Sequence, residues 1–177
     1  MRKLLFLIST IAIISCTKDE VQPTSNNISE TTSDSESDTT KTEDYEIWTG
    51  PMIEFIKGDN TDPNETINQD SITPSVSLTR GDYGEIYNVN LETIYEKGVS
   101  PKGTKWAIGD LSELESLSFV SFRAAVEKPK KAVGKKLVLH ITAENVYLSV
   151  EFTSWSQGKQ GGFAYKRSTV NSENCSE

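Results

Sequence analysis

The sequence predicts a mainly β protein: an antiparallel β-sandwich or barrel with one or two short helices. Three observations support this class. Apolar and polar residues alternate over residues 145–155, several other short runs are rich in β-branched and aromatic residues, and Gly, Pro, Asn and Asp separate these runs at short intervals. Many short strands with turn residues between them are typical of sandwiches and barrels.

The first half of the folded part is expected to contain short strands. Apolar or weakly alternating runs occur at 46–48, 52–57, 72–79, 85–94 and 104–108. Asp110 with Glu113 three residues later resembles a helix N-cap with an acid in the first turn, which predicts a helical turn before 117–122. A second short helix is expected over 122–127, because Pro129 disfavours helical backbone in the residue before it.

The second half is expected to form a three-stranded antiparallel meander. Runs at 137–141, 145–155 and 163–167 predict its strands, with a hairpin turn at 142–145 and a Gly/Gln loop at 156–160. The central strand shows the clearest alternation, with Val146, Leu148, Val150 and Phe152 against Tyr147, Ser149, Glu151 and Thr153. A period of two places the first set toward the core, and it places Tyr147 and Trp155 on the opposite face.

Four segments are expected along the chain. These are a signal peptide (1–15), a lipidated Cys16 with an acidic tether rich in Ser and Thr (16–43), the β domain (44–170) and a flexible tail (171–177). Residues 17–43 hold 7 acidic and 2 basic residues and no aromatic residue. Such a segment cannot bury enough apolar surface to offset chain entropy, so it is expected to be disordered.

Residues 1–16 predict an export signal that ends at a lipid anchor. Arg2 and Lys3 precede an apolar run at 4–14, which is too short for a spanning helix of ~20 residues. Ile13-Ile14-Ser15-Cys16 resembles the lipobox of bacterial lipoproteins, which implies acylation of Cys16 and cleavage before it. Each buried CH₂ of an acyl chain contributes ~0.8 kcal/mol, so a multiply acylated cysteine is a durable anchor. An ordinary secretory signal with a chance cysteine is the alternative.

The residues directly after the anchor predict where the protein is located. Lys18, Asp19 and Glu20 resemble the surface-export signal of Bacteroidota lipoproteins, which implies an outer-membrane protein displayed on the cell surface. The alternative is that these residues simply begin a polar tether.

The β domain also shows a resemblance along most of its length. Several segments over 46–169 together resemble an uncharacterised secreted bacterial domain: Trp48-Thr-Gly, 68–73, 78–81, Ile86-Tyr-Asn, 103–107, 116–119, Val138-Leu-His140, Val146-Tyr-Leu, 152–155 and 162–165. The resemblance implies one intact extracellular domain. It implies no catalytic residues.

Aromatic side chains are the first candidates for ligand binding. Flat rings can stack on the C–H faces of sugars, and the candidates are Tyr147, Trp155, Trp48 and Trp106. The alternative is that a second layer covers these rings and that they belong to the core.

A calcium site is the one cofactor that the sequence suggests. The loop from 59 to 70 is rich in oxygen ligands of the kind that Ca²⁺ prefers, with Asp59, Asp62, Asn64 and Asp70 as candidates. Its spacing differs from the EF-hand loop. Ordinary turn chemistry explains the same residues equally well.

Other chemically suggestive residues have simpler interpretations. His140 stands alone in the chain and is expected to be structural, and Cys175 is left without a partner once Cys16 carries lipid. Arg80-Gly-Asp82 spells an adhesion tripeptide, but chance in a turn is the better interpretation. A basic cluster is expected to be a solvated connection, with polyanion docking as its alternative: Lys128, Lys130, Lys131, Lys135 and Lys136.

Composition narrows the function. Residues 44–170 hold 17 acidic and 14 basic residues, so a domain-wide basic surface for nucleic acid is not expected. No phosphate-binding loop, dinucleotide fingerprint or zinc spacing occurs. We therefore expect a non-enzymatic domain that binds an extracellular ligand, a glycan before a protein. The alternatives are a structural or adhesion module with a protein partner and, third, a glycan-acting hydrolase.

Overall fold

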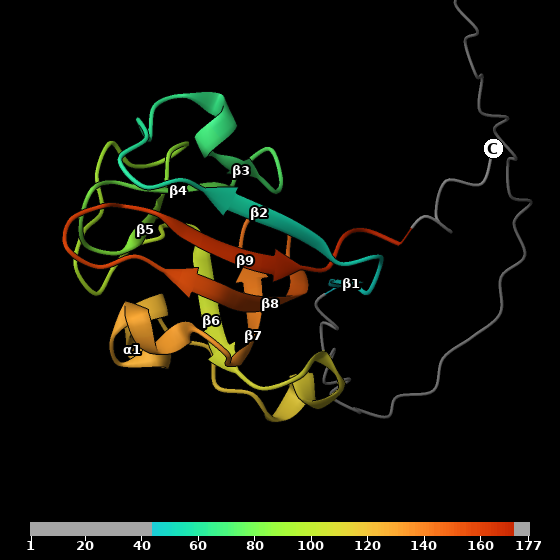
Figure 1. Cartoon of the computed structure of the whole chain (residues 1–177). Helices are drawn as coiled ribbons and strands as arrows, with labels where there is room; N and C mark the ends of the chain where they lie inside the picture. The colour runs from blue at the N-terminus through green and yellow to red at the C-terminus, as the bar shows by residue number, and fades with distance from the viewer. Residues whose placement is uncertain (1–43, 172–177) are drawn as a thin grey trace, which may run out of the picture. The chain divides into compact units, whose positions relative to one another are not determined.

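The computed structural model describes residues 44–171, which form a mainly β domain (Figure 1). These residues contain nine strands in two sheets and one short α-helix. The signal peptide, Cys16, the tether with its export residues, and Cys175 lie outside the described residues, so their predictions stay predictions. No helix within 44–171 is long and apolar enough to cross a membrane.

The larger sheet is antiparallel except at one strand. Its order is β2 (Ile53–Lys57), β9 (Phe163–Arg167), β8 (Val146–Trp155), β7 (Lys136–Ile141) and β6 (Thr104–Ile108). The first strand, β1 (Glu46–Trp48), pairs in parallel with the start of β8. The meander β7–β8–β9 confirms the prediction for the second half.

The smaller sheet consists of β3 (Asp70–Ser71), β4 (Ser77–Arg80) and β5 (Ile86–Asn88). The strands predicted over 72–79 and 85–94 were too long. The backbone N–H groups of Ile72 and Thr73 donate to the carbonyl of Val76, which closes a turn. After β5 the chain folds back in a similar way, with the N–H of Glu92 bonded to the carbonyl of Asn88.

Both helical predictions are confirmed. The carboxylate of Asp110 accepts the N–H of Ser112 at 3.1 Å and caps the 3₁₀ helix η2 (Leu111–Ser116). The α-helix α1 (Phe122–Val126) follows, and η3 (Pro129–Ala132) begins at the proline. A further 3₁₀ turn, η1 (Thr66–Asn68), precedes the smaller sheet.

One hydrophobic core joins the two sheets, which gives the sandwich-like architecture predicted from the sequence. Leu78 and Ile86 of the smaller sheet belong to the same buried cluster as Trp106, Leu148 and Phe152 of the larger sheet. Along β8 the even-numbered residues from Val146 to Phe152 are buried, as the alternation predicts.

A buried ion pair also crosses between the sheets. Arg167 of β9 donates to both carboxylate oxygens of Asp70 of β3, at 2.7 and 2.8 Å, and the Tyr165 hydroxyl donates to the same carboxylate at 2.5 Å. Burial, with the nearby charge of Asp70, raises the pKa of Tyr165 well above its ordinary value. Burial alone would lower the pKa of Arg167, but the hydrogen bond and charge of Asp70 raise it.

Candidate ligand-binding pocket

A cavity of about 300 Å³ lies where the turn after β4, the loop after β8 and the segment from α1 to η3 meet. Figure 1 shows α1 close to the C-terminal end of β8. The cavity lining contains four basic side chains, one tryptophan and no carboxylate: Arg80, Gly84, Arg123, Lys128, Pro129, Lys130, Trp155, Ser156 and Gln157. We call it the basic pocket.

Arg80 lies at the inner side of the basic pocket and is only 4% exposed. Its Nη1 donates to the carbonyls of Ser156 at 3.0 Å and Gly162 at 2.9 Å, and its Nε donates to the carbonyl of Gly84 at 3.2 Å. Among the described residues it forms no salt bridge, and its Nη2 has no hydrogen-bond partner. Burial lowers the pKa of Arg80 to about 10, so the side chain still carries its charge at neutral pH.

Position 84 requires glycine for two reasons, its backbone conformation and the close approach of a neighbouring side chain. Its φ is +87°, a left-handed conformation that favours glycine. A Cβ atom here would also lie 2.1 Å from the ring of Tyr95. The turn that supplies a carbonyl to Arg80 therefore depends on glycine.

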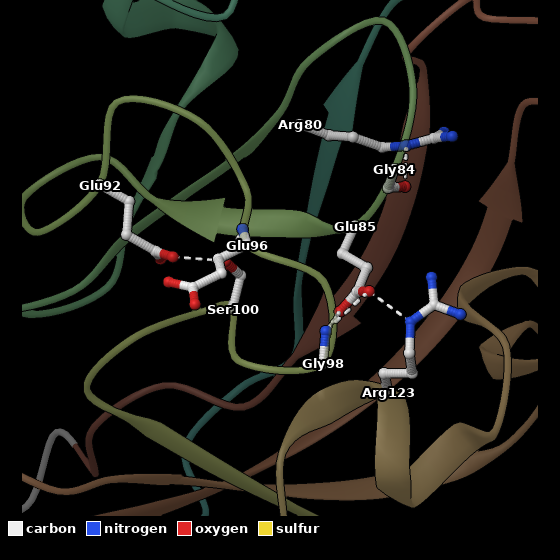
Figure 2. A network of polar contacts seen from close by, with 8 residues as sticks. All are labelled: Arg80, Gly84, Glu85, Glu92, Glu96, Gly98, Ser100 and Arg123. Atoms are coloured by element: carbon white, nitrogen blue, oxygen red, sulfur yellow. Dashed lines mark hydrogen bonds and ion pairs between the residues drawn. The ribbon is translucent and has the colours of Figure 1, made fainter.

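Arg123 of α1 forms the second guanidinium of the basic pocket, and Glu85 holds it in place. Glu85 is fully buried at the end of the same turn, and its carboxylate accepts the Nε–H of Arg123 and, at 3.2 Å, the backbone N–H of Gly98 (Figure 2). In Figure 2 the terminal nitrogens of Arg80 and Arg123 lie on the same side of the 80–85 segment. Those of Arg123 have no hydrogen-bond partner within residues 44–171.

Lys128 and Lys130 complete the basic lining from the segment that enters η3. Both side chains are exposed, while Pro129 between them is buried and fixes the backbone. The other lysines of the predicted cluster serve elsewhere: Lys131 pairs with Glu127, and Lys136 lies 3.4 Å from a carboxylate oxygen of Asp110. Only part of the basic cluster therefore contributes to the pocket.

Trp155 supplies the apolar wall, and a β-bulge turns it there. Phe152 pairs with Tyr165 and Ser154 pairs with Ala164, so Thr153 is an extra residue in β8. This single insertion shifts the alternation, and the half-buried Trp155 packs against the core on the same side as Phe152. The prediction that Trp155 shares a face with Tyr147 is therefore wrong. The guanidinium carbon of Arg80 lies 4.2 Å from the centre of the Trp155 ring, a cation–π contact.

The remaining aromatic candidates lie apart from the pocket. Trp106 is fully buried, with its Nε1 donating to the Thr104 hydroxyl at 2.9 Å, so it belongs to the core, as the alternative interpretation of the aromatic candidates has it. Trp48 is half-buried against the core, and its Nε1 has no partner within the described residues. Tyr147 stacks on His140 at a centroid distance of 4.1 Å. His140 also bonds the side chain of Asn145 at 2.9 Å, which agrees with its predicted structural role.

The structure does not bring the calcium candidates together. Asp70 uses both carboxylate oxygens for Arg167, whereas Asp62 accepts the N–H and side-chain amide of Asn64 at 2.9 Å in a local turn. Asp59 is exposed, and within the described residues no group of three or more acidic, His or Cys side chains could hold a metal ion. Turn chemistry, the alternative interpretation, accounts for this loop.

The loop after β2 is held by the side chain of Lys57. The ammonium of Lys57 donates to the carbonyl of Thr61 at 2.9 Å and to its hydroxyl at 3.1 Å. Lys57 is 2% exposed, and burial lowers the pKa of its ammonium.

A smaller aromatic cavity is lined by residues next in sequence to those of the basic pocket. It measures about 240 Å³ and its lining includes Tyr83, Tyr87, Tyr95, Asn64 and Asp82. Tyr83 and Tyr95 meet edge to face at 6.0 Å. Tyr83 and Gly84 are consecutive, so the 81–84 turn contributes to both cavities. We call the second one the tyrosine cavity.

Sequence reasoning missed the role of Arg80, Arg123 and Glu85. The sequence places Arg80 in the adhesion tripeptide and in the 78–81 segment of the resemblance, and neither assigns it to a binding site. The tripeptide is not displayed, because Arg80 is buried. Its carbonyl partners Ser156 and Gly162 lie 76 and 82 residues away, and Glu85 lies 38 residues from Arg123. One signal was available: the turn at 81–84 contains two glycines and lies between two charged residues, Arg80 and Glu85.

Comparisons with known proteins add no relative to this picture. No family model matches the chain, and neither does any curated protein or solved structure.

Proposed function

We propose that this protein is a membrane-anchored, surface-exposed lipoprotein whose β domain binds an extracellular glycan, without catalysis, in the basic pocket. The observation that carries the binding half is the position of Trp155. Of the three tryptophans, it is the one that lines the cavity, beside hydrogen-bonding cations. A ring that supplies stacking area next to a few fixed polar groups is typical of small-ligand sites.

The make-up of the pocket favours binding over hydrolysis. Glycoside hydrolysis ordinarily needs two carboxylates on either side of the scissile bond. The lining of the basic pocket contains none, and the nearest buried acid of the turn, Glu85, is bound to Arg123 and Gly98. Glu92 of the neighbouring loop is also engaged, because its carboxylate accepts the Ser100 hydroxyl and the N–H groups of Asn88 and Lys102.

The location half of the proposal is supported by the sequence. The apolar run before Cys16, the lipobox-like residues and the Lys18-Asp-Glu20 segment favour lipid anchoring and surface display. The acidic tether would hold the domain away from the membrane, with a r.m.s. reach of ~30 Å for a flexible segment of this length.

Binding should depend on Trp155 and not on the aromatic residues of the opposite face. On a glycan array, we expect a Trp155→Ala protein to lose its signal by about tenfold or more, because the aromatic wall of the pocket is gone. Tyr147→Ala is the matched control, since it removes another half-buried aromatic residue from the same strand and should leave binding unchanged.

A second blocking variant guards against loss of folding. Gln157 is exposed at the rim of the pocket, so Gln157→Trp should fill the entrance without disturbing the core. Equal melting temperatures with lost binding would support the proposal. Full binding by both pocket variants would overturn it, and loss on Tyr147→Ala would move the site to the other face.

Surface display has its own test. Replacing Lys18, Asp19 and Glu20 together with Ala should reduce digestion of the protein by protease added to intact cells. A matched variant with Ala at three acids further along the tether, Glu30, Asp34 and Glu36, should be digested like wild type. Unchanged digestion of the Lys18–Glu20 variant would contradict the export proposal.

A further inference from the structure

The basic pocket contains a buried cation that no carboxylate of the described residues contacts directly. Moving a cation from water into a protein is costly unless an anion or several dipoles compensate for it. Arg80 is only 4% exposed, yet its hydrogen bonds within the described residues all go to neutral carbonyls. Burial lowers the pKa of Arg80 and the charge of Asp59 raises it in part, but the two side chains form no salt bridge. Because Arg80 lines the basic pocket, an anionic ligand bound there could supply a partner for its Nη2.

The other lining groups extend the same charge. Arg123 is positioned by Glu85 through Nε, which leaves its two terminal nitrogens for a ligand. Lys128 and Lys130 add two exposed ammonium groups at the rim. Four cations thus surround a cavity in a domain with 17 acidic and 14 basic residues, so this concentration is local and not a property of the whole surface.

Building on the proposed function, we infer that the bound glycan carries an anionic group, a carboxylate or a sulfate, which Arg80 and Arg123 hold while the exposed part of the Trp155 side chain contacts the adjoining sugar. Planar guanidinium groups match both anions with paired, charge-assisted hydrogen bonds. The Arg80 guanidinium lies over the Trp155 ring, so a sugar against the exposed part of the Trp155 side chain would bring its acidic substituent close to the arginine. The lysines would attract the anion from the entrance.

Calorimetric titration of the purified protein with matched oligosaccharides tests this inference. The probes are an oligomer of uronic acid, a sulfated neutral oligomer and neutral oligomers of the same lengths. We expect at least one anionic probe to bind about tenfold or more tightly than its neutral counterpart. The two anionic arms then distinguish carboxylate from sulfate.

A charge-neutral double variant separates specific recognition from general attraction. Glu85→Gln with Arg123→Gln removes a pocket cation together with its buried partner, leaving the net charge unchanged and no unpaired carboxylate behind. We expect this protein to lose about tenfold in affinity for the anionic probe and to lose much less for the neutral probe, whose hydrogen bonds to Arg123 carry no charge on the ligand. Lys128→Gln with Lys130→Gln should lose several-fold, whereas the control pair Lys131→Gln with Lys135→Gln, on the same segment but outside the pocket, should retain wild-type affinity.

Each outcome decides between the two proposals. Equal affinity for anionic and neutral glycans would overturn the inference and leave the proposed function standing. No binding of any glycan would overturn the proposed function itself. Equal losses in the two lysine pairs, or binding of oligoglutamate as tight as that of the acidic saccharides, would replace glycan recognition with general attraction of polyanions.

Discussion

Replacing Asp70 with Asn is expected to lower the free energy of unfolding by about 3–5 kcal/mol, since removing one member of a buried ion pair leaves the other charge uncompensated. Arg167 and Asp70 are 6% and 7% exposed, and Arg167 has no other ion-pair partner within residues 44–171. The change keeps the size of the side chain and one oxygen for the Tyr165 hydroxyl. The loss can therefore be assigned to the charge of Asp70 and to the second hydrogen bond that its carboxylate accepts from Arg167.

Urea denaturation monitored by tryptophan fluorescence measures this effect. Asp82→Asn is the matched control, because Asp82 is exposed and forms no salt bridge among the described residues. The control should stay within about 0.5 kcal/mol of wild type. A loss below about 1 kcal/mol in the Asp70 variant would mean that water reaches this pair and that it does not lock the two sheets together.

The Trp106→Ala variant is expected to be about 3–5 kcal/mol less stable than wild type, the usual cost of removing a large aromatic side chain from a packed core. Trp106 is fully buried and contacts Phe122 and Phe152 at ring-centre distances of 5.1 and 6.3 Å. It thereby connects β6 with α1 and β8. Removing the ring would open a cavity beneath the helix that carries Arg123.

Tyr83→Ala provides the contrast, since Tyr83 is an aromatic residue that is 53% exposed. It should change the denaturation midpoint little. A Trp106→Ala protein that unfolds at the same urea concentration as wild type would contradict the assignment of Trp106 to the core, and would restore it as a candidate ligand-binding residue.

The strands that the sequence predicted well are those with a clear pattern in the nearby sequence. The alternation in β8 and the turn at 142–145 can be recognised from a short stretch of neighbouring residues, and the structure follows this alternation as far as Phe152. Beyond it, one inserted residue, Thr153, reverses the orientation of Trp155. A bulge has no mark in a single sequence, so the pocket's aromatic wall was assigned to the wrong face.

The predictions that failed concern residues whose partners lie far along the chain. Asp70 looked like a calcium ligand next to other acids, but its partner Arg167 is 97 residues away. Arg80 looked like part of an exposed turn, although carbonyls from the loop after β8 bury it. Lys128 and Lys130 were recognised as basic, but only the fold shows that they face two arginines across a cavity.

The most direct test of the proposed site uses the three tryptophan indoles as reporters in one nuclear magnetic resonance titration. Each Nε1–H gives its own signal, and the three rings have different positions: Trp106 in the core, Trp48 half-buried beside it, and Trp155 in the basic pocket. Titration with the anionic oligosaccharide that binds best should shift the Trp155 signal progressively to saturation, while those of Trp48 and Trp106 stay in place. Binding that leaves the Trp155 signal unmoved, or that shifts Trp48 instead, would show that the ligand binds outside the basic pocket.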